Sequence, residues 1–139
     1  MPSFRHSSRN VKLSMFSKSP APAENWTRFA LPGDIEECRR LHKLHGTTYY
    51  YATQRFKPEI RRQVHALYGF VRVPDEWVDN PGDMSVQDRQ KKLAQYRSEM
   101  MRGYDGVCPS HPVLRAFVDV MHESAIPIEE PLIFLGAME

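Results

Sequence analysis

The chain has 139 residues, 41% hydrophobic and 26% charged, an ordinary balance for a soluble globular domain with one modest core. Its net charge of +2 is too small to indicate a nucleic-acid-binding surface, and no stretch reaches the roughly 20 apolar residues of a membrane span. Cys38 and Cys108 form no motif and suit a reducing compartment, either within the core or at an exposed position.

The N-terminal residues 1–24 differ in composition from the rest of the chain. They are basic and Ser-rich and contain no acid before Glu24, and Pro20 and Pro22 mark a linker. Two interpretations stay open: a disordered tail, which we favour, and an organelle-targeting segment over residues 1–23. Residues 25–139 predict one helical domain.

Helix start and stop signals follow one another along this domain. Asp34 with Glu37 three residues later has the pattern of a capping box, and Gly46 can end that helix. A shorter element is expected over residues 47–56, and a long helix from Pro58 to near Asn80.

Three further helices are predicted after this long one. Ser85 with Asp88 opens the first and Gly103 stops it, and Pro112 and Pro127 open the other two. No alternating strand pattern and no repeat is present, so the predicted fold class is all-α.

The long helix carries an unusual set of side chains, which we call the acidic stripe: Tyr68, Arg72, Asp75 and Asp79. Their steps of four, three and four place them within roughly 60° of one another on a helix that turns about 100° per residue. Two carboxylates one turn apart can hold Mg²⁺ that is also bound to phosphate oxygens, and an arginine can hold the phosphate. A solvated helix face is the alternative. An adjoining face is expected to be buried through Ile60, Val64, Leu67, Val71 and Val78.

The segment around the acidic stripe resembles the squalene/phytoene synthase family of head-to-head isoprenoid synthases. The resemblance runs without a gap from about His45 to Asp79, and weaker similarity continues to Met138. The residues that carry it are Thr48-Tyr49, Arg61, the run from Ala66 to Arg72, and the D-x-x-x-D motif of Asp75 and Asp79.

The resemblance implies the N-terminal part of an isoprenoid-synthase helical bundle and a specific reaction. Family members are transferases of carotenoid and terpenoid biosynthesis that condense two allylic isoprenoid diphosphates head-to-head with loss of diphosphate. By position, Asp75 and Asp79 would bind Mg²⁺ (or Mn²⁺), and Tyr68 and Arg72 would contact diphosphate or stabilise developing charge. Thr48 and Tyr49 would bind substrate at the entrance of the site.

Several partners and a location follow from the same resemblance. The substrate would be geranylgeranyl or farnesyl diphosphate, with a phytoene-type product favoured, and NADPH would be needed only for a squalene-type product. We expect a cytoplasmic protein with peripheral membrane association as an option. Neither nucleic acid nor a partner protein is predicted.

The chain departs from the family pattern in three respects. It is about half the family's length and lacks the second aspartate-rich motif, so we expect an N-terminal fragment or truncated product that is inactive alone. Pro74 predicts a kink or a local break directly before Asp75. Gly46 stands where some relatives have serine. A non-catalytic assembly or binding protein and a truncated remnant are the alternative functions.

Two aromatic positions beside the motif also carry expectations. Among the three consecutive tyrosines from Tyr49 to Tyr51, only Tyr49 is expected in the site, because of the family match. His65 falls beside the acidic stripe, and we expect it to have a polar surface role.

Overall fold

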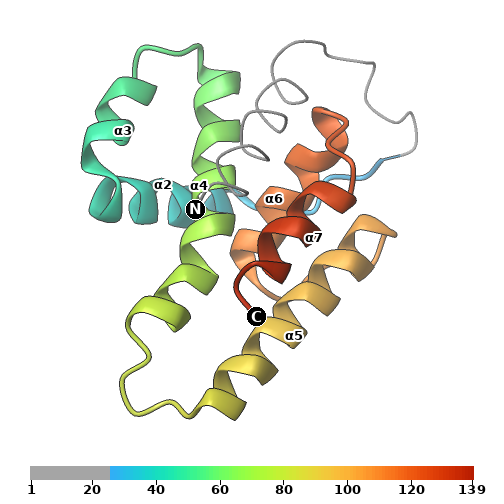
Figure 1. Ribbon diagram of the computed structural model, residues 1–139. Helices are drawn as coiled ribbons and strands as arrows, with labels where there is room; N and C mark the ends of the chain where they lie inside the picture. The colour runs from blue at the N-terminus through green and yellow to red at the C-terminus, as the bar shows by residue number, and fades with distance from the viewer. Residues whose placement is uncertain (1–25) are drawn as a thin grey trace.

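The computed structural model describes residues 26–139, and within this range it contains six α-helices and no strand (Figure 1). This confirms the predicted all-α fold class. The expectations for the N-terminal tail fall outside the described residues. The helices are α2 (Pro32–His45), α3 (Thr47–Thr53), α4 (Pro58–Asp79), α5 (Val86–Tyr104), α6 (Pro112–Glu123) and α7 (Glu129–Gly136).

Most helix ends lie where the sequence predicts them, with four exceptions. Helix α2 begins at Pro32 rather than at Asp34, whose carboxylate instead accepts a hydrogen bond from the Leu31 N–H at 2.8 Å. Helix α3 ends at Thr53, short of the predicted residue 56, and α7 begins at Glu129 instead of Pro127. Helix α5 ends at Tyr104, one residue after the predicted stop at Gly103. In the first case proline's fixed φ suits the first helical turn, so the helix starts at the earlier residue.

The core forms where α2, α4 and α6 pack against one another, with α5 against α6 and α7 against α5 (Figure 1). Helix α4 approaches α2 closely at Gly69, where a Cβ atom would stand 2.9 Å from the Cys38 Sγ. One residue further on, the Phe70 ring stacks on Phe117 of α6 with 4.0 Å between ring centroids. Gly69 therefore allows α4 to pack closely against both α2 and α6.

The predicted buried face of α4 is wrong. The residues that the structure buries are His65, Ala66, Gly69, Phe70 and Pro74. The five apolar residues predicted to form this face are all only half-buried, although Leu67 and Val71 still touch the core. The reason is that α4 packs against both α2 and α6, so its most buried residues are those that lie between these two helices, where the small Ala66 and Gly69 permit close helix contact.

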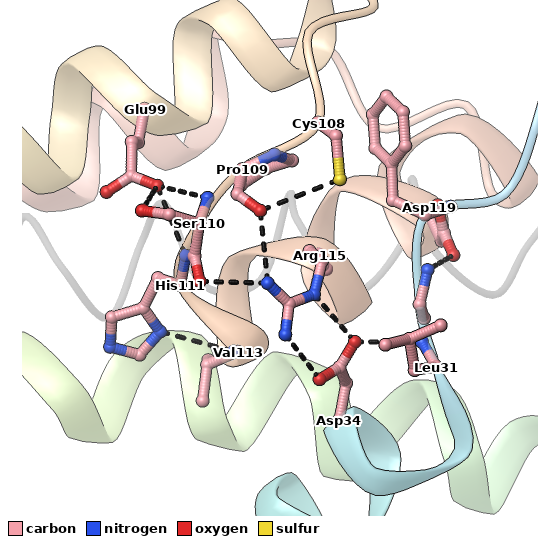
Figure 2. A network of polar contacts seen from close by, with 12 residues as sticks. Leu31, Asp34, Glu99, Cys108, Pro109, Ser110, His111, Val113, Arg115 and Asp119 are labelled. Carbon is pink, nitrogen blue, oxygen red and sulfur yellow. Dashed lines mark hydrogen bonds and ion pairs between the residues drawn. The ribbon is translucent and has the colours of Figure 1, made fainter.

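A polar network fastens α6 to α2 and to the loop before it (Figure 2). The Arg115 guanidinium donates two hydrogen bonds to the Asp34 carboxylate, both 2.8 Å, and two more to the carbonyls of Pro109 and Ser110. This pairing lowers the pKa of Asp34. Glu99 of α5 accepts hydrogen bonds from the backbone N–H and hydroxyl of Ser110. The network thus fixes the start of α6, against which α4 packs.

Candidate functional site

The acidic stripe lies on one continuous helix. Helix α4 extends from Pro58 to Asp79 and passes through Pro74, so of the kink or local break predicted there, the local break is wrong and the kink stays a prediction. The four stripe side chains therefore keep the common face that their spacing predicts. Tyr68, Arg72 and Asp75 are half-buried, and Asp79 lies at the last residue of the helix.

Arg72 is held in place by acids of its own helix. Its Nη1 lies 3.2 Å from the Asp75 carboxylate, and its Nη2 bonds to Glu76, a partner that the sequence analysis did not single out. The i,i+4 spacing of Arg72 and Glu76 was the available signal. The Arg72 Nε is buried and has no hydrogen-bond partner among the described residues. The guanidinium is therefore oriented while one of its donors stays unsatisfied.

Asp75 and Asp79 interact electrostatically across one helical turn. Burial raises the pKa of Asp75, and the charge of Asp79 raises this pKa further, against a smaller lowering by Arg72. A raised pKa means that the ionised pair is disfavoured on its own, because like charges repel in a partly desolvated place. A bound cation would relieve that repulsion.

Tyr68 connects the stripe to a buried cluster of rings. Its ring stacks on the His42 imidazole with 4.4 Å between centroids, and burial raises the pKa of its hydroxyl. The ring also covers Gly46, where a Cβ atom would stand 2.8 Å from the Tyr68 Cε2 atom. Gly46, which stands where some relatives have serine, therefore lies directly against a stripe residue.

The buried cluster below Tyr68 was not predicted. His42 and His65 are 1% and 4% exposed, and their Nδ1 atoms lie 3.0 Å apart. Tyr50 packs against both rings and accepts a hydrogen bond from Arg39 at 2.9 Å. The surface role expected for His65 is therefore wrong. Its burial depends on α2, so the sequence of α4 carried no signal for it.

Thr48 and Tyr49 lie on α3 and are both exposed, Tyr49 to 74%. Among the described residues, no hydrogen bond or ring contact joins either side chain to the acidic stripe. Of the three consecutive tyrosines, Tyr50 is the one that approaches Tyr68, through their shared contact with His42. The substrate-binding role of Thr48 and Tyr49 stays a prediction.

The stripe fits a divalent cation that brings some of its own ligands. No cluster of three or more candidate metal-binding side chains occurs within residues 26–139, so Asp75 and Asp79 supply at most a partial set. Mg²⁺ commonly binds one or two carboxylates together with substrate phosphates and water. The unsatisfied Arg72 Nε–H beside them could donate a hydrogen bond to a phosphate oxygen.

Comparison with known proteins identifies the family of the chain. The sequence profile of the squalene/phytoene synthase family matches residues 42–139, which include the whole acidic stripe. The chain belongs to this family. No solved structure matches it.

Two curated relatives of this squalene/phytoene synthase family member are phytoene synthases. The phytoene synthase of Rhodobacter capsulatus is 30% identical over 98 residues, which are 70% of this chain and 28% of the relative. The bifunctional lycopene cyclase/phytoene synthase of Phycomyces blakesleeanus is 35% identical over 71 residues, which are 51% of this chain and 11% of the relative. The chain thus spans less than a third of each relative.

Among the described helices, none is long and apolar enough to cross a membrane.

Proposed function

We propose that this chain supplies the diphosphate-binding helix of a phytoene-synthase-type prenyltransferase. The enzyme would condense two allylic isoprenoid diphosphates head-to-head, with geranylgeranyl diphosphate favoured over farnesyl diphosphate. The family match and the two phytoene synthase relatives support this class of reaction. The chain is proposed to be inactive alone, because two carboxylates give only one partial cation site within the described residues.

One observation carries the proposal: the buried Arg72 Nε has no hydrogen-bond partner, although the rest of the guanidinium is paired. A buried donor without a partner is unfavourable unless a ligand satisfies it. Its neighbours on the acidic stripe are two carboxylates and a phenol, so an anionic ligand would have to arrive with a cation. A metal-bound diphosphate meets both requirements.

The chemistry asked of these residues is loss of diphosphate from an allylic carbon. The C–O bond breaks and its electron pair leaves with the diphosphate, so catalysis requires the growing negative charge to be neutralised. Arg72 would donate to the leaving oxygens, and Tyr68 would present its hydroxyl and ring on the same face. Asp75 and Asp79 would hold Mg²⁺ or Mn²⁺, which supplies Lewis-acid neutralisation of the diphosphate when bound.

The remaining functional expectations belong to the same proposal. Thr48 and Tyr49 would contact the substrate from α3, and NADPH would be required only for a squalene-type product. A cytoplasmic location with peripheral attachment to membranes would bring the protein to isoprenoid substrates that partition into lipid.

The test is to replace the matched segment of the Rhodobacter capsulatus phytoene synthase with residues 42–139 of this chain. We expect the chimera to form phytoene from geranylgeranyl diphosphate when Mg²⁺ is present. The same chimera carrying Asp75→Asn and Asp79→Asn should bind no Mg²⁺–pyrophosphate and form no product, while Asp83→Asn serves as a matched control. A chimera that folds and works equally well without the two aspartates would refute the proposal.

A further inference from the structure

Pro74 leaves a gap in the hydrogen bonding of α4 directly before Asp75. In an α-helix the N–H of residue 74 would donate to the carbonyl oxygen of residue 70. Proline has no N–H, so the Phe70 carbonyl loses its helical partner. Phe70 is 2% exposed, and water therefore cannot serve as a substitute. A carbonyl in this position needs another donor from within the protein.

The missing donor is Tyr96 on α5. Its hydroxyl donates to the Phe70 carbonyl oxygen at 2.9 Å, across 26 residues of sequence. Tyr96 is 2% exposed, its ring stacks on Phe70 at 5.6 Å between centroids, and Trp77 meets that ring edge-on at 5.5 Å. Burial raises the pKa of the Tyr96 hydroxyl far above its usual value, so it stays protonated and able to donate.

The turn that this bond holds is the one that carries the charged residues. Arg72 lies between Phe70 and Pro74, and Asp75 follows Pro74 directly. Without a hydrogen-bond donor to the Phe70 carbonyl oxygen, the helix would be free to open at this turn, where proline already weakens it. Any opening would change the direction of Asp75 and Asp79 relative to Arg72.

We propose that Tyr96 is a positioning residue for the acidic stripe: its hydroxyl replaces the backbone hydrogen bond that Pro74 removes and thereby fixes the turn between Phe70 and Asp75. A tyrosine that only filled the core would need its ring but not this bond. The consequence for metal and diphosphate binding rests on the proposed function, whereas the consequence for the backbone of α4 does not.

The test is a double-mutant cycle in the full chain with Tyr96→Phe, Pro74→Ala and both together. Tyr96→Phe should speed hydrogen exchange of the backbone amides of residues 71–73 and 75–79 at least tenfold. It should also weaken binding of Mn²⁺ with inorganic pyrophosphate several-fold. In the Pro74→Ala background the same change should have little effect on either quantity, because the alanine restores a backbone N–H that can donate to Phe70. Tyr104→Phe, also on α5, is the matched control and should change neither quantity.

The outcomes separate this proposal from the proposed function. Equal effects of Tyr96→Phe in the native and the Pro74→Ala backgrounds would overturn the positioning role. If Asp75→Asn leaves Mn²⁺–pyrophosphate binding unchanged in the native chain, the proposed function fails, while the exchange rates still decide the role of Tyr96. If Tyr96→Phe does not fold, recovery of helical circular dichroism in the double variant supports the proposal, and no recovery overturns it.

Discussion

The Tyr68 ring lies against Gly46 so closely that a Cβ atom on residue 46 would stand 2.8 Å from the ring. Real Cβ atoms do not approach a neighbour this closely, so any larger residue at 46 must displace the ring. The ring is in turn stacked on His42, which is buried and paired with His65. The position of a proposed diphosphate contact is thus coupled to one glycine and to a histidine pair.

Gly46→Ser should therefore displace Tyr68 and destabilise the protein. Overpacking of this kind costs about 1–3 kcal/mol, and we expect that loss in the free energy of unfolding measured with urea. Gly33→Ala is the matched control, since nothing lies within 4 Å of a Cβ atom at that position. The control should be neutral or stabilising by up to about 1 kcal/mol. A serine variant as stable as the native chain would show that the ring adapts freely.

The His42–His65 pair should make stability fall at acid pH. Burial lowers the pKa of both imidazoles, that of His65 to about 4. Below pH 6.5 the unfolded state therefore binds more protons at these two histidines than the folded state does. Stability is complete above pH 6.5 and declines as the pH falls toward 4, by on the order of 1–3 kcal/mol. Urea unfolding at pH 7.5 and 4.5 measures this difference.

The contribution of the pair is isolated by comparison with variants. His42→Phe combined with His65→Leu should flatten the pH dependence, whereas His45→Gln, at an exposed position of α2, should leave it unchanged. An equal loss of stability on acidification in the native chain and the double variant would contradict the prediction.

Asp79→Asn should lower the pKa of Asp75. The Asp79 charge contributes to the raised pKa of Asp75, but burial is the larger cause, so the pKa should fall only part of the way to its usual value. Titration of the Asp75 carboxyl carbon by NMR measures the change. Asp83→Asn is the control, because its charge does not contribute to this pKa. An unchanged Asp75 pKa in the Asp79 variant would show that the two carboxylates do not interact.

Arg72→Lys should weaken binding of Mn²⁺–pyrophosphate although the positive charge is retained. Lysine lacks the Nε donor that is unsatisfied in the structure, and it cannot match the planar fork of arginine. We expect at least a tenfold loss of affinity by titration calorimetry, equivalent to about 1.4 kcal/mol. Arg97→Lys, which changes an α5 arginine paired with Glu139, should have no effect on this affinity. Equal affinities for the Arg72 variant and the native chain would exclude a role of Nε in binding.

Only one of the two cysteines should react rapidly with a thiol reagent. Cys38 is buried, and burial raises the pKa of its thiol to about 12, whereas Cys108 is exposed. Because the thiolate is the reactive form, native protein should release about one equivalent of chromophore quickly with a disulfide reagent. Cys108→Ser should abolish that fast phase, and Cys38→Ser should not. Two fast equivalents in the native state would indicate that α2 opens readily.

Features that depend on neighbours along the chain could be predicted from the residues alone. Prolines at 58 and 112 and the Ser85 cap mark helix starts that the structure reproduces, because these residues act on the backbone within one turn. The common face of Tyr68, Arg72, Asp75 and Asp79 followed from their spacing, since an unbroken α-helix repeats every 3.6 residues. The run from about His45 to Asp79 also carried the resemblance to the squalene/phytoene synthase family, which the family match over residues 42–139 confirms.

The buried face of α4 and the surroundings of the stripe depend instead on how the helices pack. His65 meets His42 across 23 residues, and Phe70 meets Tyr96 across 26. These contacts exist because α2 and α5 pack beside α4, and helical periodicity within α4 carries no information about its neighbours. The helix runs through Pro74 for the same reason: the donor that compensates for the proline comes from another helix.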